Sequence, residues 1–179
     1  MSGAASVWYF AYGSNMQAAT FRGRRGITPM RALPGRAPGW QLVLDKPGVV
    51  LARCGVASIV PAPGDEVLGV LYELAPADLA QVDLTEGVLI GNYERSTILV
   101  APLDGTPAVA AETLVSAARQ PGMRPSRTYM TLLIEGALEH GLPAWWIERL
   151  RAVAVEDETR EERELRTLLD DALVKLRGQ

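Results

Sequence analysis

Six short apolar runs, most of them bounded by glycine or proline, are spread over the first two thirds of the chain and restrict its fold more than any other feature. Runs of this length between turn residues predict strands, and Asp104-Gly105 tolerates the positive φ that a hairpin turn needs. The separator Pro61-Ala62-Pro63-Gly64-Asp65 predicts a loop. The predicted strands are Ser6–Ala11, Trp40–Asp45, Gly55–Val60, Val67–Leu74, Tyr93–Val100 and Val109–Val115.

Apolar residues at the spacing typical of a helix occur once between these runs and then through most of the last third of the chain. Proline favours the first position of a helix and glycine the position just beyond its end, so Pro76 and Gly87 predict a helix whose last residue is Glu86. Ser126 is a good N-cap for a second helix, which Gly141 ends. A short helix follows, with two tryptophans near its start.

Domains are usually about 150 residues long, so the length of 179 residues predicts one domain over residues 1–179. Together, the predicted elements indicate an α+β fold, a small mixed β-barrel of about six strands flanked by helices. An amphipathic helix at about 156–177 closes the chain. Its leucine face must pack on the body of the domain or on a second copy, which would make a homodimer.

Charge and composition exclude several classes of function. A net charge of −3 disfavours binding to nucleic acid or to an anionic membrane. Cys54 is the one cysteine and His140 the one histidine, so a thiolate or multi-histidine metal site is excluded. The chain has no apolar stretch of about 18 residues, and its first residues do not resemble a secretory signal. These features predict a cytoplasmic protein that does not bind membranes and has no metal site.

The turn Gly13-Ser14-Asn15 is the first candidate for chemistry, because it follows an apolar and aromatic strand. Successive backbone N–H groups in such a turn can hold a carboxylate or a developing oxyanion. Gly13 lacks a Cβ, so a ligand can approach the main chain closely there. On pattern alone, an ordinary turn or a helix N-cap is the favoured interpretation.

Glu86 is the second candidate. Its carboxylate would face the negative end of the helix dipole, and the apolar neighbours Leu84, Val88 and Leu89 would desolvate it, so both effects would raise its pKa. A glutamate with a raised pKa can exchange protons near neutral pH. The alternative interpretation is a solvated residue at a helix end.

Other polar residues have ordinary explanations. Tyr129, in the first turn of its helix, can point its hydroxyl at a ligand or serve as a core tyrosine. His140 lies in the last turn, where the helix dipole favours an imidazolium, and this predicts a capping role. Arg22, Arg24 and Arg25 could touch a phosphate, but a solvated loop is favoured because the net charge is negative.

Four segments, in this order, resemble the gamma-glutamylcyclotransferase family: Tyr9–Met16, Ile59–Val67 with Gly69-Val70, Asp83–Val88 followed by Tyr93, and Pro125–Tyr129 with Gly136–Pro143. Asn15 is typical of this branch rather than of its glutathione-degrading relatives. The resemblance implies a β-barrel flanked by helices, with the glutamyl group held near the Tyr12-Gly13-Ser14 turn. It also implies that Glu86 is the acid/base catalyst and that the substrate is bound by Tyr9, Phe10, Ala11, Tyr12, Gly13, Ser14 and Tyr129.

The implied substrate is a small gamma-glutamyl amide or dipeptide whose own α-amine attacks its γ-carbonyl, releasing 5-oxoproline and a free amine or amino acid. This reaction needs no cofactor. The turn amides would act either as an oxyanion hole or as a clamp on the α-carboxylate. Two alternatives stay open: a non-catalytic binding module for acidic amino-acid-like ligands, and a specialised cyclotransferase that removes a gamma-glutamyl protecting group in a biosynthetic pathway.

Overall fold

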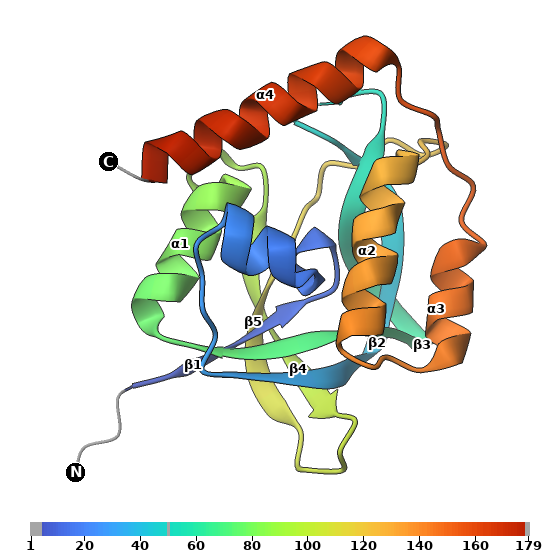
Figure 1. Cartoon of the computed structure of the whole chain (residues 1–179). Helices are drawn as coiled ribbons and strands as arrows, with labels where there is room; N and C mark the ends of the chain where they lie inside the picture. Colours follow the sequence, from blue (N-terminus) through green and yellow to red (C-terminus); the bar gives the residue numbers. More distant parts are fainter. Residues whose placement is uncertain (1–4, 50, 178–179) are drawn as a thin grey trace.

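The computed structural model describes residues 5–49 and 51–177, and in these ranges five strands form a closed barrel (Figure 1). The strand order around the barrel is β1-β3-β2-β4-β5. Neighbouring strands are antiparallel except β1 and β5, which are parallel, so the barrel is mixed as predicted. The strands are β1 (Val7–Ala11), β2 (Arg31–Pro47), β3 (Gly55–Leu74), β4 (Glu94–Pro102) and β5 (Val109–Val115).

The strand count is lower than predicted because the loop expected at Pro61–Asp65 does not divide β3. The two apolar runs on either side of it belong to one long strand. The pairing with β2 changes from Pro38 opposite Glu66 to Trp40 opposite Pro61, so residues 62–65 lie in an irregularity of the ladder. Prolines are tolerated at such a bulge because no ladder hydrogen bond is required of them there.

The predicted helix boundaries are confirmed for α1 (Pro76–Glu86) and α2 (Arg127–Glu139). Gly87 ends α1 with a φ of 73°, a value that favours glycine. The Ser126 hydroxyl caps α2 by accepting a hydrogen bond from the Tyr129 N–H at 3.1 Å. The remaining helical segments are η1 (Ser14–Met16), η2 (Ala19–Arg24), η3 (Val88–Ile90), α3 (Ala144–Arg151) and α4 (Arg160–Arg177).

Helix α4 begins at Arg160, later than the predicted start at about residue 156, and crosses over one end of the barrel above α1 and α2 (Figure 1). Of its predicted leucine face, Leu165 and Leu168 are exposed. The side chains of Leu169, Leu173 and Leu176 lie outside the described residues. The homodimer therefore stays a prediction. Within the described ranges, no helix is both long enough and apolar enough to cross a membrane.

Helix α2 holds the η1–η2 segment against the barrel. A Cβ added to Gly136 would lie 2.6 Å from the Gln17 backbone nitrogen, so the helix and the chain after η1 are in backbone contact. Glu139 accepts a hydrogen bond from the Ala18 N–H at 2.7 Å, and Glu135 accepts one from the Gln17 side chain at 2.5 Å. The end of α2 thus fixes the segment that follows the Gly13-Ser14 turn.

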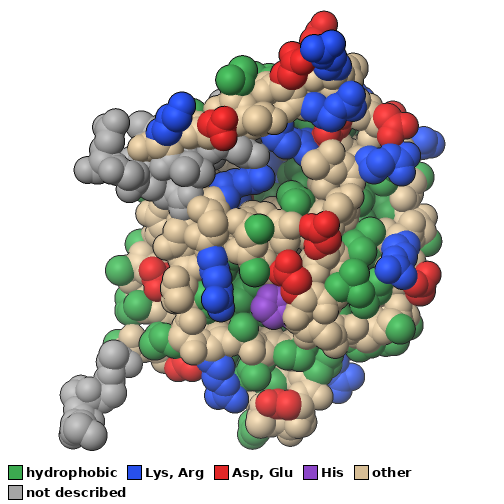
Figure 2. Space-filling view, viewed as in Figure 1, with side chains coloured by type: hydrophobic (Ala, Val, Ile, Leu, Met, Phe, Trp, Pro, Cys, Tyr) green, Lys and Arg blue, Asp and Glu red, His purple; other side chains and the backbone are tan. Residues whose placement is uncertain are grey.

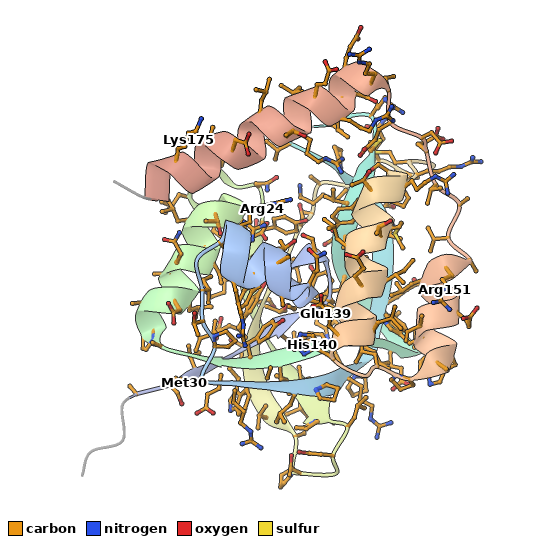
Figure 3. The ribbon with its side chains drawn as sticks, viewed as in Figure 1. Arg24, Met30, Glu139, His140, Arg151 and Lys175 are labelled. Atoms are coloured by element: carbon orange, nitrogen blue, oxygen red, sulfur yellow. The ribbon has the colours of Figure 1, made fainter. Side chains whose placement is uncertain are left out.

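His140 caps α2 as predicted, but its surroundings disfavour the imidazolium. Figure 3 shows it beside Glu139 at the end of the helix. Its Nε2 lies 3.1 Å from the Tyr72 hydroxyl, and the two rings meet edge to face. Burial lowers the pKa of His140, although a backbone contact with Met16 and the charge of Glu139 oppose this effect. Desolvation is the largest of these effects, so the charged form expected at the helix end is disfavoured.

The lowered pKa of His140 predicts that the folded state loses stability as the pH falls below about 6.5, the ordinary histidine pKa, because the unfolded state then binds a proton that the folded state does not. The His140→Gln variant lacks this titration. Its melting temperature, measured from pH 7.5 to 5, is expected to fall less steeply than that of the wild type. Equal slopes for the two proteins would contradict the assignment.

Candidate active site

The two candidate segments, the turn after β1 and the end of α1, meet at one cavity. The cavity measures about 40 Å³. It brings Glu86 together with the Gly13-Ser14 turn, more than 70 positions earlier in the chain. Its lining consists of Tyr9, Tyr12, Gly13, Ser14, Asn15, Ala57, Glu86, Tyr93, Leu114 and Tyr129.

The Glu86 carboxylate is held by side chains of two other segments. Asn15 Nδ2 donates a hydrogen bond to Glu86 Oε1 at 2.8 Å, and Arg25 Nη2 lies 2.6 Å from the same oxygen. Arg25 Nε donates to Asn15 Oδ1 at 2.5 Å, which closes a three-membered network. The Glu86 side chain is only 16% exposed. It is therefore a fixed, largely buried carboxylate rather than a solvated helix end.

Two of the three apolar neighbours expected to desolvate Glu86 are themselves exposed, Leu84 by 61% and Leu89 by 83%. The third, Val88, is partly buried against the core. The expectation of a solvated arginine loop is wrong for Arg25, whose side chain is 12% exposed. Arg25 follows the π-helix η2, and its guanidinium also donates to the Thr85 carbonyl at 3.1 Å. It binds both the side chain and the backbone at the end of α1.

Neutral phenols surround this single carboxylate. Burial raises the pKa of each cavity tyrosine well above the ordinary value of 10, and the negative charge of Glu86 adds to the effect. Tyr12 donates its hydroxyl proton to the Leu114 carbonyl, and Tyr93 donates to the Ala57 carbonyl at 2.8 Å. At neutral pH the cavity therefore presents protonated hydroxyl groups from Tyr9, Tyr12, Tyr93 and Tyr129.

Tyr129 extends its hydroxyl from the first turn of α2 to the turn after β1. Its hydroxyl accepts a hydrogen bond from the Ala57 N–H at 3.0 Å. A Cβ on Gly13 would lie 3.2 Å from the same hydroxyl and 3.3 Å from the Ala57 Cβ. Such contacts are tighter than ordinary packing allows without adjustment, so glycine lets the turn and the tyrosine approach each other closely.

Two of the residues implied in substrate binding do not line the cavity. Phe10 and Ala11 are buried in the barrel core, where they pack around Gly69. Asn15 belongs to the turn predicted as a candidate site, but its contact with Glu86 was not predicted. The contact between Arg25 and Glu86 was not predicted either. The contact of Arg25 depends on how η2 folds back toward α1.

A larger cavity of about 420 Å³ adjoins the first and shares Ser14, Glu86, Tyr93 and Tyr129 with it. Its basic lining residues are Arg24, Arg25, Lys46 and Arg166, the last of which belongs to α4. Figure 2 shows basic side chains gathered beneath α4, where the surface is hollowed. Among the described residues, no group of three His, Cys, Asp or Glu side chains could hold a metal ion.

Comparison with known proteins identifies the family. The AIG2-like family profile matches residues 66–150, which include Glu86 and Tyr129. The gamma-glutamylcyclotransferase of Mus musculus is 30% identical over 148 residues, covering 81% of this chain and 77% of the mouse protein. The chain belongs to the gamma-glutamylcyclotransferase family. The resemblance found in the sequence is thereby confirmed, and the protein is an enzyme of this type.

Two further relatives extend the comparison of this gamma-glutamylcyclotransferase family member. The gamma-glutamyl cyclotransferase aclK of Aspergillus oryzae is 33% identical over 165 residues, covering 81% of this chain but only 60% of the fungal protein. A solved structure named gamma-glutamyl cyclotransferase superposes with a TM-score of 0.76 at 26% identity, covering 90% of this chain and 98% of its own. The barrel and its helices are therefore those of the family.

Proposed function

We propose that this enzyme converts gamma-glutamyl amides or dipeptides into 5-oxoproline and a free amine or amino acid, with Glu86 as the acid/base catalyst. One observation carries the proposal: a single fixed carboxylate faces the Gly13-Ser14 turn across a cavity lined by neutral phenols. A site that cyclises its substrate needs a proton carrier next to a place that holds one molecule in a folded conformation. The cavity supplies both.

The reaction is balanced by moving protons within the substrate. The α-ammonium loses two protons as its nitrogen attacks the γ-carbonyl carbon, and the leaving nitrogen gains two as its bond to that carbon breaks. One carboxylate can carry both protons in turn. Positioning contributes the rest, because effective molarities of about 10⁵ to 10⁸ M are typical of well-aligned intramolecular attack.

The contacts of Glu86 suggest which oxygen does this work. Among the described residues, the side-chain contacts of Glu86 fall on Oε1, where Asn15 and Arg25 hold it. We assign proton transfer to Oε2. Arg25 and Asn15 then act as positioning residues, because they hold the carboxylate by its other oxygen.

The tetrahedral intermediate carries an oxyanion that needs donors already in place. Gly13, Ser14 and Tyr129 line the same cavity, and we assign the donors to the backbone N–H groups of the turn and the Tyr129 hydroxyl. These donors bind either the oxyanion or the α-carboxylate of the glutamyl group. A structure with bound 5-oxoproline would show which donors contact the carboxylate.

Incubation of the purified protein with gamma-glutamyl-L-alanine tests the proposed function. We expect 5-oxoproline and alanine to appear in equal amounts, without added metal or cofactor. Saturable binding without 5-oxoproline would instead indicate a binding module for acidic amino-acid-like ligands. A series of gamma-glutamyl compounds with different leaving amines would show whether the enzyme is specialised for one of them, as a deprotecting enzyme in a biosynthetic pathway would be.

A further inference from the structure

Lys46, near the end of β2, is a buried ammonium group that the proposed reaction does not use. The residue is only 2% exposed, yet it lines the larger cavity. Its Nζ donates to Asn92 Oδ1 at 2.7 Å and to the Pro47 carbonyl at 3.1 Å. It also lies 4.5 Å from the centre of the Tyr93 ring. All of these partners are neutral.

Other cations of the same cavity have carboxylate partners in direct contact. Arg25 pairs with Glu86, and Arg166 pairs with Glu158. Among the described residues, Lys46 has no carboxylate within ion-pair distance. Burial lowers the pKa of Lys46, and the more distant charge of Glu86 only opposes this effect. A buried charge without a counter-ion is costly, and a bound carboxylate would supply the missing counter-ion.

The position of Lys46 indicates which part of a substrate it would meet. Lys46 lines the larger cavity and not the smaller one beside the Gly13-Ser14 turn. Asn92 ties it to the catalytic end of α1, because Asn92 Nδ2 donates to the Glu86 backbone carbonyl at 2.8 Å while its Oδ1 accepts from Lys46. With the glutamyl group in the smaller cavity, the leaving group extends past Glu86 toward Lys46.

We infer that Lys46 binds the carboxylate of the leaving group when the substrate is a gamma-glutamyl amino acid or peptide, and that Lys46 thereby makes the enzyme prefer these substrates to gamma-glutamyl derivatives of simple amines. This inference rests on the proposed function. The larger cavity has room for a whole amino acid at about 420 Å³. Val49, Leu84 and Ile90 add an exposed apolar rim to it, which suits an apolar side chain on the leaving group.

Two substrates that differ by one carboxylate test the inference: gamma-glutamyl-L-alanine and gamma-glutamylethylamide. The wild type is expected to show a kcat/KM about 10- to 100-fold higher for the alanine compound, the range typical of a hydrogen bond to a charged group. Lys46→Met should remove most of this preference. It should lower kcat/KM about 10- to 100-fold for the alanine compound and less than about threefold for the ethylamide.

Lys175→Met is the matched control, because it makes the same change of charge at an exposed position on α4 (Figure 3). It should leave both substrates unaffected. Equal kcat/KM values for the two substrates in the wild type would overturn the inference. So would an equal loss for both in Lys46→Met, because Lys46 would then serve the glutamyl group or the fold. If Lys46→Met does not fold, Lys46→Gln gives the same comparison, because it removes the charge but keeps an N–H donor for Asn92.

Failure of the proposed function would look different, since the wild type would then release no 5-oxoproline from either substrate. Binding of free L-alanine and of ethylamine, measured by calorimetry, would still test Lys46 in that case. Saturable binding of L-alanine that ethylamine does not show, and that Lys46→Met loses, supports the carboxylate site. Equal binding of the two compounds, or no binding of either, overturns it.

Discussion

Replacing Glu86 with glutamine is expected to lower the rate of 5-oxoproline release about 10²- to 10⁴-fold, the usual contribution of a positioned acid or base. The amide keeps the shape of the carboxyl group but cannot carry a proton between the two substrate nitrogens. Binding of a gamma-glutamyl dipeptide should persist, because the Gly13-Ser14 turn and the tyrosines stay in place. Release is measured by chromatography of 5-oxoproline and binding by calorimetry.

The Glu86→Gln result needs a control for stability, because the change also leaves the largely buried Arg25 without its partner. Thermal unfolding of the variant shows whether the loss of activity comes from unfolding. Glu94→Gln makes the same chemical change at an exposed position on β4 and should leave turnover unchanged. Undiminished turnover by folded Glu86→Gln would contradict the catalytic assignment.

Adding one methyl group at Gly136 is expected to destabilise the fold by about 1 to 3 kcal/mol, the usual cost of overpacking a core. The Cβ of Gly136→Ala would lie 2.6 Å from the Gln17 nitrogen and 2.7 Å from the Met16 carbonyl carbon, so α2 and η1 must move apart. Asn15 lies in η1 and Tyr129 in α2, so the same shift should lower kcat/KM. Denaturant unfolding measures the first effect and 5-oxoproline release the second.

Gly23→Ala is the matched control for Gly136→Ala, because a Cβ at Gly23 meets nothing within 4 Å. It should retain stability and activity close to those of the wild type. If Gly136→Ala proved as stable and as active as this control, the contact between α2 and η1 would not position the site.

Local signals in the chain were sufficient for much of the fold. Pro76 and Gly87 marked both ends of α1, and with them the position of Glu86 at its last turn. Ser126 marked the start of α2. These boundaries depend on the conformational preferences of single residues, so they can be predicted without knowing what lies nearby. The bulge in β3 could not be predicted in this way, because its Pro-Gly pattern also fits a loop. Only the pairing with β2 distinguishes the two.

Patterns of neighbouring residues were enough to identify the groups that could carry the chemistry: a glutamate at a helix end, a glycine turn after a strand and a tyrosine in the first turn of α2. The surroundings of these groups depend on the folded chain. Asn15 and Arg25 hold the Glu86 carboxylate from positions 71 and 61 residues away in the chain. Lys46, near the end of β2, meets the neutral side chain of Asn92 from a distant segment. The burial and pairing of a charge depend on segments that folding brings together, whereas turns and helix ends depend on residues adjacent in the chain.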